Sequence, residues 1–313
     1  MATYSAERPQ GAREFIDNAS PQATLSSSSE SENFDVYARP RSIEEAALAM
    51  SAPGALAMCG GTDVYPAHAG RPLVRPIVDL SGISSLKGIT ETPGAFRFGA
   101  ATSWSEIARA ALPPAFDGLK AAAREVGSIQ IQNRGTIGGN LCNASPAADG
   151  VPPLLCLDAS VELASQHERR VLPLSAFITG YRKTVLRNGE IVTAVIVPKP
   201  AASAAGAFVK LGARRYLVIS ILMAAAVVEK DETGRIATVA VAVGAASPVA
   251  QRLTRLEQDL LGLLPGERPS TRVAAHHLDG LSPISDVRAS DAYRREAAIA
   301  VVGQALDRAA GAF

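Results

Sequence analysis

The chain has 313 residues, which is enough for two or three compact domains. Its 31 basic and 30 acidic residues nearly cancel, so its charge gives no reason to expect nucleic acid or an anionic membrane surface as a partner. No apolar run approaches the roughly 20 residues of a membrane-spanning helix, and the N-terminus lacks the basic-then-apolar order of a secretory signal. The three cysteines are too few and too far apart for a disulfide framework or a CxxC metal site. These features predict a soluble cytoplasmic protein.

The N-terminal part divides into a polar extension and the start of a folded domain. Residues 1–34 are polar and contain a run of four serines, a composition that predicts disorder. Ser42 and Glu45 have the spacing of a capping box that opens a helix reaching Met50. A buried strand is expected at 56–58, and it leads directly into the sequence Cys-Gly-Gly-Thr-Asp at 59–63. A glycine turn after a strand places backbone donors at the end of that strand, where α/β proteins commonly hold ligands.

Short strands and helices are then expected in alternation. Residues 76–80 predict a strand, and 86–90 with 95–100 predict a hairpin around Thr-Pro-Gly. A second capping box predicts a helix over 103–112, and an amphipathic helix is expected over 115–126.

The stretch Arg134 to Asp149 reads RGTIGGNLCNASPAAD and has two adjacent glycines among polar residues. Paired glycines allow the backbone to turn with φ > 0 and to approach another molecule closely. Successive N–H groups in such a turn form a concave nest that attracts phosphate. Together with the glycines at 60–61, this stretch suggests a ligand that carries a diphosphate. The alternative is that both are tight structural turns.

The rest of the chain predicts a second, smaller unit. A broken helix is expected at 147–159, a hairpin at 161–163 and 170–172, and a strong strand at 191–197. Short elements without a long βαβ alternation favour an α+β fold over a doubly wound sheet. Beyond a small-residue linker at 201–206, the pattern predicts an antiparallel sheet with helices on one side. Its expected strands are 208–214, 218–228 and 236–243, and its expected helices are 253–264 and 291–306.

Several common sites are missing from the sequence. It has no GxxxxGK[ST] phosphate loop, no GxGxxG fingerprint and no GxSxG nucleophile turn. His276 and His277 are adjacent, so they cannot present two ligands from one helix face, and we expect them to be a surface feature. Cys59 and Cys142 lie beside the glycine segments, where a small side chain beside a ligand is expected rather than a reactive thiol.

Five groups of residues, taken in order, resemble one family. They are Gly60 to Asp63; Thr136 to Asn140 with Ala144-Ser145-Pro146 and Asp149; Gly180-Tyr181-Arg182-Lys183-Thr184; Lys210 with Arg214-Arg215; and Ile284 to Arg288 before Tyr293-Arg294. This set resembles the FAD-binding, or medium, subunit of the molybdenum hydroxylases, the family of xanthine dehydrogenase and carbon monoxide dehydrogenase. The resemblance extends from Phe34 to Ala309. One glycine motif alone would be weak, whereas the ordered set is specific.

The resemblance implies a fold and a set of cofactor residues. It implies a two-part FAD domain of the vanillyl-alcohol-oxidase (PCMH) type at 35–200, followed by a small α+β domain at 206–310. Both glycine segments would bind the FAD diphosphate through backbone N–H groups. The expected cofactor-binding residues are Ala57, Met58, Cys59, Gly60, Gly61, Thr62, Asp63, Val64, Val126, Thr136, Ile137, Gly138, Gly139, Asn140, Ser145, Asp149, Val185 and Lys210.

Two of these residues are implied to have polar roles. Asp149 would hydrogen-bond polar groups of FAD. Lys210 would lie near the flavin, where a cation stabilises an anionic reduced ring in a poorly solvated site. The alternative for Lys210 is a solvated lysine on a strand.

The resemblance also implies partners. A large subunit would carry the molybdopterin cofactor and hydroxylate the substrate, and a small subunit would carry 2Fe–2S clusters that pass electrons to FAD. The assembly expected is a dimer of heterotrimers. Tyr216-Leu217-Val218 follow Arg214-Arg215, where xanthine dehydrogenase has acidic residues, so NAD is one of several open acceptors. No cysteine set for a 4Fe–4S cluster accompanies the second glycine segment. No catalytic residue and no metal ligand are expected on this chain.

Two other classes of function stay open at this point. One is a stand-alone flavin oxidase or reductase of the same fold, although no set of His, Tyr or Cys residues marks a substrate pocket. The other is a non-enzymatic binding protein whose glycine segments are only turns. Oxidation of a small molecule without partners would favour the first, and absence of any flavin chromophore would favour the second.

Overall fold

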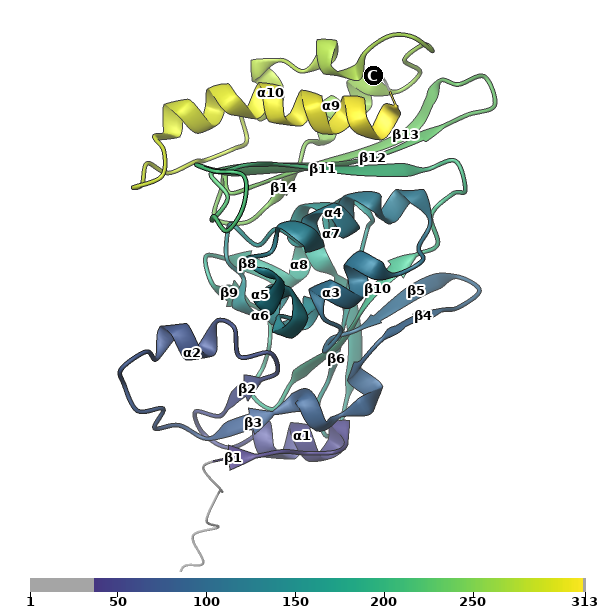
Figure 1. The fold of residues 1–313 in the computed structure, drawn as a ribbon. Helices are drawn as coiled ribbons and strands as arrows, with labels where there is room; N and C mark the ends of the chain where they lie inside the picture. The colour runs from purple at the N-terminus through teal and green to yellow at the C-terminus, as the bar shows by residue number, and fades with distance from the viewer. Residues whose placement is uncertain (1–36, 312–313) are drawn as a thin grey trace, which may run out of the picture. The chain divides into compact units, whose positions relative to one another are not determined.

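The computed structural model describes residues 37–311, which belong to one compact unit (Figure 1). The predicted extension at 1–34 lies outside these residues. Among the helices of the described part, none combines the length and the apolar character needed to cross a membrane. The elements confirm the expected α+β class, because helices are mixed with one small parallel and several antiparallel sheets.

The first sheet is parallel and brings the first glycine segment into place. Its strands β1 (Tyr37–Ala38), β3 (Ile77–Asp79) and β2 (Leu56–Met58) lie in that order. Helix α1 (Ile43–Met50) begins at Ser42, whose Oγ accepts a hydrogen bond from the Glu45 N–H. Strand β2 is where it was predicted, and the short helix α2 (Val64–Ala67) follows the glycines.

A five-stranded antiparallel sheet supports the helices that carry the second glycine segment. Its order is β4 (Ile89–Glu91), β5 (Ala95–Gly99), β10 (Ile191–Pro198), β6 (Ser160–Ala164) and β7 (Arg169–Pro173). Both predicted hairpins are confirmed as β4–β5 and β6–β7. Strand β10 lies at the centre, and because its side chains are buried on both faces its sequence is nearly all apolar.

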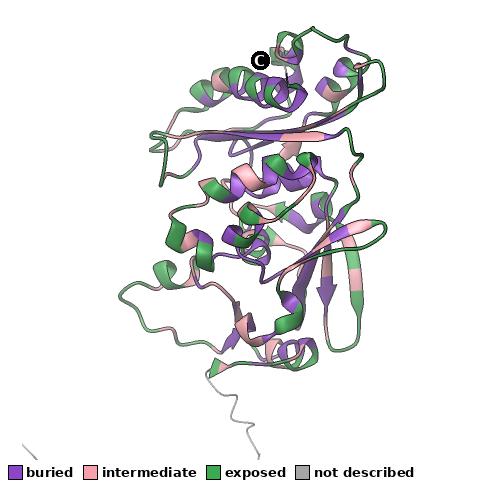
Figure 2. Ribbon diagram, turned by 45° about the vertical axis from the view of Figure 1, so that its right-hand side comes forward, coloured by how far each residue is buried: buried purple, intermediate pink, exposed green. Residues whose placement is uncertain are grey.

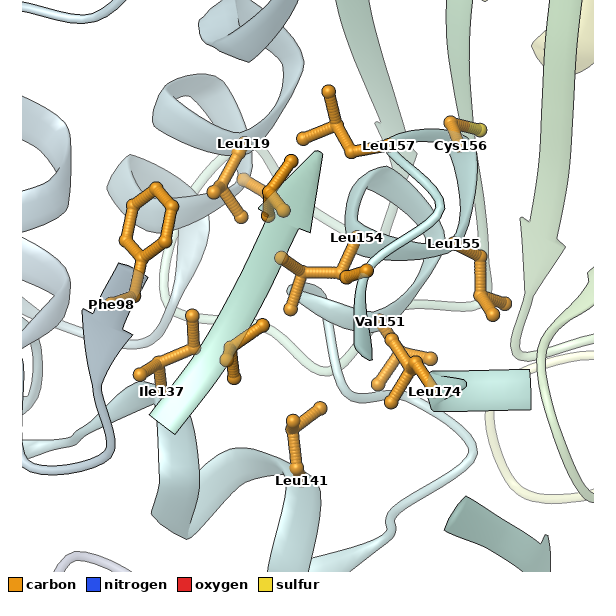
Figure 3. Close-up of a cluster of buried hydrophobic side chains, with 14 of the residues drawn as sticks. Phe98, Leu119, Ile137, Leu141, Val151, Leu154, Leu155, Cys156, Leu157 and Leu174 are labelled. Carbon is orange, nitrogen blue, oxygen red and sulfur yellow. The ribbon is translucent and has the colours of Figure 1, made fainter. Parts of the chain in front are cut away.

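Several helices pack over this sheet around one core (Figure 3). They include α3 (Trp104–Arg109), α4 (Asp117–Glu125), α6 (Ile137–Asn143) and α7 (Val151–Cys156). A further helix, α5 (Ile129–Arg134), packs against α3 and α4. The sequence predicted α3, α4 and the broken helix that is α7. It did not predict α5 or α6, because both are short and the glycine pair in α6 has low helix propensity. Short elements complete this part: α8 (Leu174–Phe177), β8 (Ile178–Gly180), β9 (Lys183–Thr184) and the 3₁₀ turns Leu80–Gly82, Ser84–Leu86 and Pro114–Phe116.

The C-terminal sheet is antiparallel, as predicted, with the order β11 (Ala205–Leu211), β12 (Leu222–Lys230), β13 (Ile236–Gly244) and β14 (Gln251–Arg252). Residues 205–206, expected to be linker, belong to β11. The remaining elements are α9 (Thr254–Leu260), α10 (Asp291–Ala310) and the 3₁₀ turns Pro269–Arg272 and Ala275–Leu278.

The helices of the C-terminal unit itself, α9 and α10, lie on one face of this sheet, as predicted, and helices of the first domain cover the other face. Helix α10 packs on one face, whereas α4 and α7 of the first domain pack on the other (Figures 1 and 2). Alternate residues of β12 therefore enter two different cores: Leu222 and Ala224 face α10, while Met223 and Ala225 face the first domain. The two domains are joined through a buried sheet face.

Candidate functional site

A cavity of about 740 Å³ brings the two glycine segments together, within the size range of small-molecule and cofactor sites. It is also lined by residues near the start of β12, so it draws on both domains. All of the predicted cofactor residues line it except Ile137, Gly138 and Val185. The lining residues that were not among the predicted cofactor-binding residues include Trp104, Gly127, Ser128, Ile131, Asn143, Ala147, Ala148, Arg182, Leu217, Val218 and Ile219.

The first glycine segment offers free backbone donors. Gly61 has φ +71°, which allows the chain to reverse after β2. Within residues 37–311, the N–H groups of Gly60, Gly61 and Thr62 donate to no protein acceptor. A Cβ on Gly60 would overlap the carbonyl oxygen of Arg134, so the two segments touch through backbone here. Free N–H groups at such a turn are what the predicted anion-binding role requires.

The second glycine segment differs from the predicted nest. Thr136 is the N-cap of α6, and its Oγ1 accepts from the Gly139 N–H at 3.1 Å. The N–H groups of Ile137 and Gly138 donate to the carbonyl oxygens of Thr102 and Ala100 at 3.0 and 2.9 Å. The φ angles of Gly138 and Gly139 are not positive. The cap and the contacts with Ala100 and Thr102 have taken up the donors of this helix start. Gly138 allows close packing against Ala100, whereas Gly139 lines the cavity.

The three predicted residues that do not line the cavity contribute to the packing of the fold. Ile137 is fully buried and points into the hydrophobic core (Figure 3). A Cβ on Gly138 would lie 2.7 Å from the Cβ and the carbonyl oxygen of Ala100, so Gly138 allows α6 to approach β5. Val185 packs against the same core, and its N–H donates to Phe177 O.

Asn140 lines the cavity, but its side-chain oxygen is closed off from it. The Oδ1 atom of Asn140 is buried and has no hydrogen bond among the described residues. It lies beside Gly150, where a Cβ would collide with the Trp104 ring. An unpaired buried acceptor costs roughly 1–3 kcal/mol, and this oxygen does not open into the cavity, because it has almost no accessible surface.

A buried ion pair joins the two domains at the cavity. Lys210 Nζ lies 2.7 Å from Asp149 Oδ2 and 3.1 Å from the carbonyl oxygen of Glu125. The Ser220 hydroxyl donates to Asp149 Oδ1 at 2.6 Å. The Asp149 and Lys210 side chains are only 8% and 7% exposed. Burial raises the pKa of Asp149, and the charge and hydrogen bonds of Lys210 oppose that rise.

The mouth of the cavity is bridged by side chains from three segments. Asn143 Nδ2 donates to Asp63 Oδ1 at 2.9 Å, and Arg182 Nη1 donates to Asn143 Oδ1 at 2.5 Å. The Arg182 N–H also donates to Ala144 O, in the turn that ends α6. The sequence motif around Arg182 suggested the family, but its local pattern did not reveal this contact.

The cysteines beside the cavity fit the predicted packing role. Desolvation by the surrounding protein raises the pKa of the Cys142 thiol, although the residue is exposed at the cavity. Burial also raises the pKa of Cys59. Both groups are therefore neutral thiols near pH 7, and nucleophilic chemistry needs the thiolate.

The histidine pair is only partly a surface feature, which corrects that expectation. His276 is exposed, but His277 is buried. Both ring nitrogens of His277 already have partners: Nδ1 accepts from the Ala274 N–H at 3.1 Å, and Nε2 lies 2.9 Å from Asp259 Oδ2. One ligand atom from each of Asp259, His276 and His277 falls within 4.8 Å of the others. Because the Ala274 bond occupies the Nδ1 lone pair, Nε2 carries the proton and is not free to bind a metal.

These features fit FAD better than a smaller ligand. The free N–H groups at Gly60 to Thr62 can hold an anionic diphosphate. Val126 and Ile131 supply apolar surface for a ring, and Lys210 supplies a cation.

Comparisons with known proteins agree with this geometry. Residues 30–200 match the family described as FAD binding domain in molybdopterin dehydrogenase, and residues 207–309 match the CO dehydrogenase flavoprotein C-terminal domain. The chain is 31% identical over 267 residues to a putative xanthine dehydrogenase FAD-binding subunit of Escherichia coli K12, covering 84% of this chain and 91% of that one. It is also 31% identical to the nicotine 6-hydroxylase medium subunit of Paenarthrobacter nicotinovorans, covering 82% and 91%.

Solved structures give the same result. A chain of the Cu,Mo-CO dehydrogenase superposes with a TM-score of 0.82 at 26% identity, covering 88% of this chain and 97% of that one. Quinoline 2-oxidoreductase from Pseudomonas putida 86 gives 0.79 at 28% identity, with 88% and 96% covered. The chain therefore belongs to the family of FAD-binding oxidoreductase subunits of the molybdenum hydroxylases, which includes the xanthine and carbon monoxide dehydrogenases.

Proposed function

We propose that this chain is the electron-transfer subunit of a heteromeric molybdenum hydroxylase. It would take electrons from 2Fe–2S clusters of a small partner subunit and pass them to NAD or another acceptor. A large partner subunit would hold the molybdopterin cofactor and hydroxylate a small substrate of the purine, N-heterocycle, aldehyde or CO class. The observation that carries this proposal is the shared cavity, which combines free backbone donors and a buried lysine.

The first glycine segment would hold the diphosphate of FAD. Its three free N–H groups at Gly60, Gly61 and Thr62 face the cavity and can each donate to a phosphate oxygen. The second segment would contribute a surface without side chains at Gly139. This division differs from a clamp in which both segments donate through backbone, because α6 has already used its first donors.

Lys210 would provide charge near the redox-active ring. Its ammonium group is held at the cavity wall by Asp149 and by Glu125 O, in a site where poor solvation strengthens Coulomb interactions. FAD supports one- and two-electron steps, and the protein contributes its position and its electrostatic environment. Acid–base chemistry on this chain is not needed for hydroxylation by another subunit.

The assembly proposed is a dimer of heterotrimers in the cytoplasm. Relatives named as medium subunits or as subunits of a dehydrogenase complex support the multi-subunit part of this proposal. Cys59, Cys142 and Cys156 are free thiols, as is common for proteins of a reducing compartment.

Co-purification from the native host tests the electron-transfer role. The purified complex is expected to contain this chain with FAD, a molybdenum subunit and an iron–sulfur subunit. Addition of a purine, an aldehyde or an N-heterocycle should then bleach the flavin absorbance, and addition of NAD or a dye should restore it. A flavin that is reduced by substrate in the isolated chain would favour a stand-alone oxidoreductase. A chain that holds no FAD in the complex would contradict the proposal.

A further inference from the structure

Ser220 occupies a buried position that no sequence motif singled out. It lies just before β12, is 2% exposed, and directs its hydroxyl to Asp149 Oδ1 at 2.6 Å. The two residues are 71 positions apart and belong to different domains. Their hydrogen bond fixes one oxygen of a carboxylate whose other oxygen binds Lys210.

The backbone that carries Ser220 is itself held in place. The next residue, Ile221, donates its N–H to Leu211 O at 2.8 Å and accepts a hydrogen bond from Arg294 Nη1. Arg294 is 3% exposed and also donates to Ala245 O at 3.0 Å. The side chain of Ser220 is therefore presented to Asp149 from a constrained backbone.

Lys210 keeps capacity for a ligand. An ammonium group has three donors, and within the described residues Nζ is paired with Asp149 Oδ2 and Glu125 O. Lys210 lines the cavity, so its third donor is available there. Rotation of the Asp149 carboxylate would move the ammonium, because Oδ2 is its only charged partner at hydrogen-bond distance among these residues.

We propose that Ser220 is a positioning residue: it orients the Asp149 carboxylate so that this group holds the Lys210 ammonium at the cavity wall. This inference rests on the proposed function, because the cofactor addressed by Lys210 is FAD. It also gives Asp149 an indirect role through Lys210, in place of the direct hydrogen bond to FAD that the sequence predicted.

The physical consequence of removing the hydroxyl follows from the buried network. A hydrogen bond to a charged group favours the charged form, so losing it raises the pKa of Asp149 further. The charged groups that face Asp149 are Lys210, which favours the carboxylate, and Glu125, which opposes it. With Ser220 replaced by alanine, the carboxylate gains freedom to rotate, and Lys210 loses its fixed position.

The test uses the full chain after removal of its flavin, titrated with FAD over a range of pH. Ser220→Ala is expected to weaken FAD binding by about fivefold, the change that about 1 kcal/mol produces. The inflection in the pH profile that belongs to Asp149 should move to higher pH. Ser220→Thr keeps the hydroxyl and should retain most of the affinity.

Ser247→Ala is the matched control. Ser247 is a buried serine of the same domain that does not line the cavity, and its hydroxyl bonds Ala246 O and the Ser282 N–H. This variant should lose similar thermal stability without a shift in the FAD affinity or its pH profile. If Ser220→Ala does not fold, Ser220→Cys is the second variant, because it has a side chain of similar size with only a weak donor. It should show the same loss of FAD affinity and the same shift of the pH inflection, both smaller than in Ser220→Ala.

A double-variant cycle separates an indirect role from a direct one. In a Lys210→Met background, Ser220→Ala is expected to have no further effect on FAD affinity, because Ser220 acts through Lys210. Equal effects in both backgrounds, or an unmoved pH inflection in Ser220→Ala, would overturn the inference. A wild-type chain that binds no FAD at all would instead contradict the proposed function.

Discussion

Gly138 and Gly139 are neighbours on α6, but they face different surroundings. Gly139 lines the cavity, and the nearest atom to an added Cβ is Thr136 Oγ1 at 3.0 Å. Gly138 faces β5, where an added Cβ would lie 2.7 Å from the Cβ and the carbonyl oxygen of Ala100. Replacing Gly139 by valine should therefore affect mainly FAD affinity, and replacing Gly138 by valine should affect mainly the stability of the fold.

The magnitudes follow from these contacts. In Gly139→Val the φ angle is not strained, and the helix propensity of valine is similar to or better than that of glycine, so stability should change by less than about 1 kcal/mol. The new side chain would occupy the space of the ligand. Overpacking of this kind costs roughly 1–3 kcal/mol, which corresponds to a loss of about 5- to 150-fold in FAD affinity.

Gly138→Val should show the opposite pattern. Its Cβ would push α6 away from β5, where backbone atoms cannot yield as side-chain ends do, so we expect a loss of stability of about 1–3 kcal/mol or more. The assay is a pair of measurements on each variant: urea unfolding of the flavin-free chain, and FAD titration of the same preparation. Normal FAD affinity in Gly139→Val would refute the placement of the cofactor against α6. Equal loss of stability in the two variants would refute the assignment of Gly138 to the packed side of α6 and of Gly139 to the cavity side.

Three further outcomes are expected. Gly60→Ala should weaken both FAD retention and stability, because its Cβ would overlap the carbonyl oxygen of Arg134; unfolding curves and flavin content that match the wild type would speak against the contact between the two segments. Trp104 is the single tryptophan of the chain and lines the cavity, so FAD titration should quench the tryptophan fluorescence, and unchanged emission at saturation would place FAD elsewhere. Burial opposes the shift at Asp286, but hydrogen bonds from backbone N–H groups and Arg294 lower its pKa from 3.8 to about 2. A carboxyl whose pKa is lower in the folded than in the unfolded chain stabilises the fold at pH values above its unfolded pKa. This stabilisation is lost as the pH falls toward 2. The stability difference between wild type and Asp286→Asn should therefore be full at pH 7 and shrink below about pH 4, and a difference independent of pH would contradict it.

The sequence predicted those parts of the fold that depend on local patterns. The turns Thr-Pro-Gly at 92–94 and the capping box at Ser103 have short-range chemistry, and the strands and helix next to them are confirmed. The glycine pair at 138–139 predicts a turn with φ > 0, but the structure has these residues in α6 with φ angles that are not positive. Tertiary packing against Ala100 overrides the preference for a turn, although Thr136 at the N-cap position was an available signal for a helix start.

The buried network at the cavity could not be predicted from local patterns. Asp149 and Lys210 are 61 positions apart, and Ser220 stands in an apolar stretch that predicts a strand. Only the packing of α4 and α7 against the face of β11 and β12 brings these groups together. The near-continuous apolar run of β12 does indicate a strand covered on both faces, because such a strand loses the alternation of apolar and polar residues.

The flavin content of the isolated chain tests the central claim most directly. The full chain, expressed without partners and purified with FAD present, should be yellow. Heat denaturation should release about one FAD per chain, identified by chromatography against FMN and riboflavin standards. A colourless chain that also fails to bind added FAD, while its circular dichroism shows a folded α+β protein, would contradict the account.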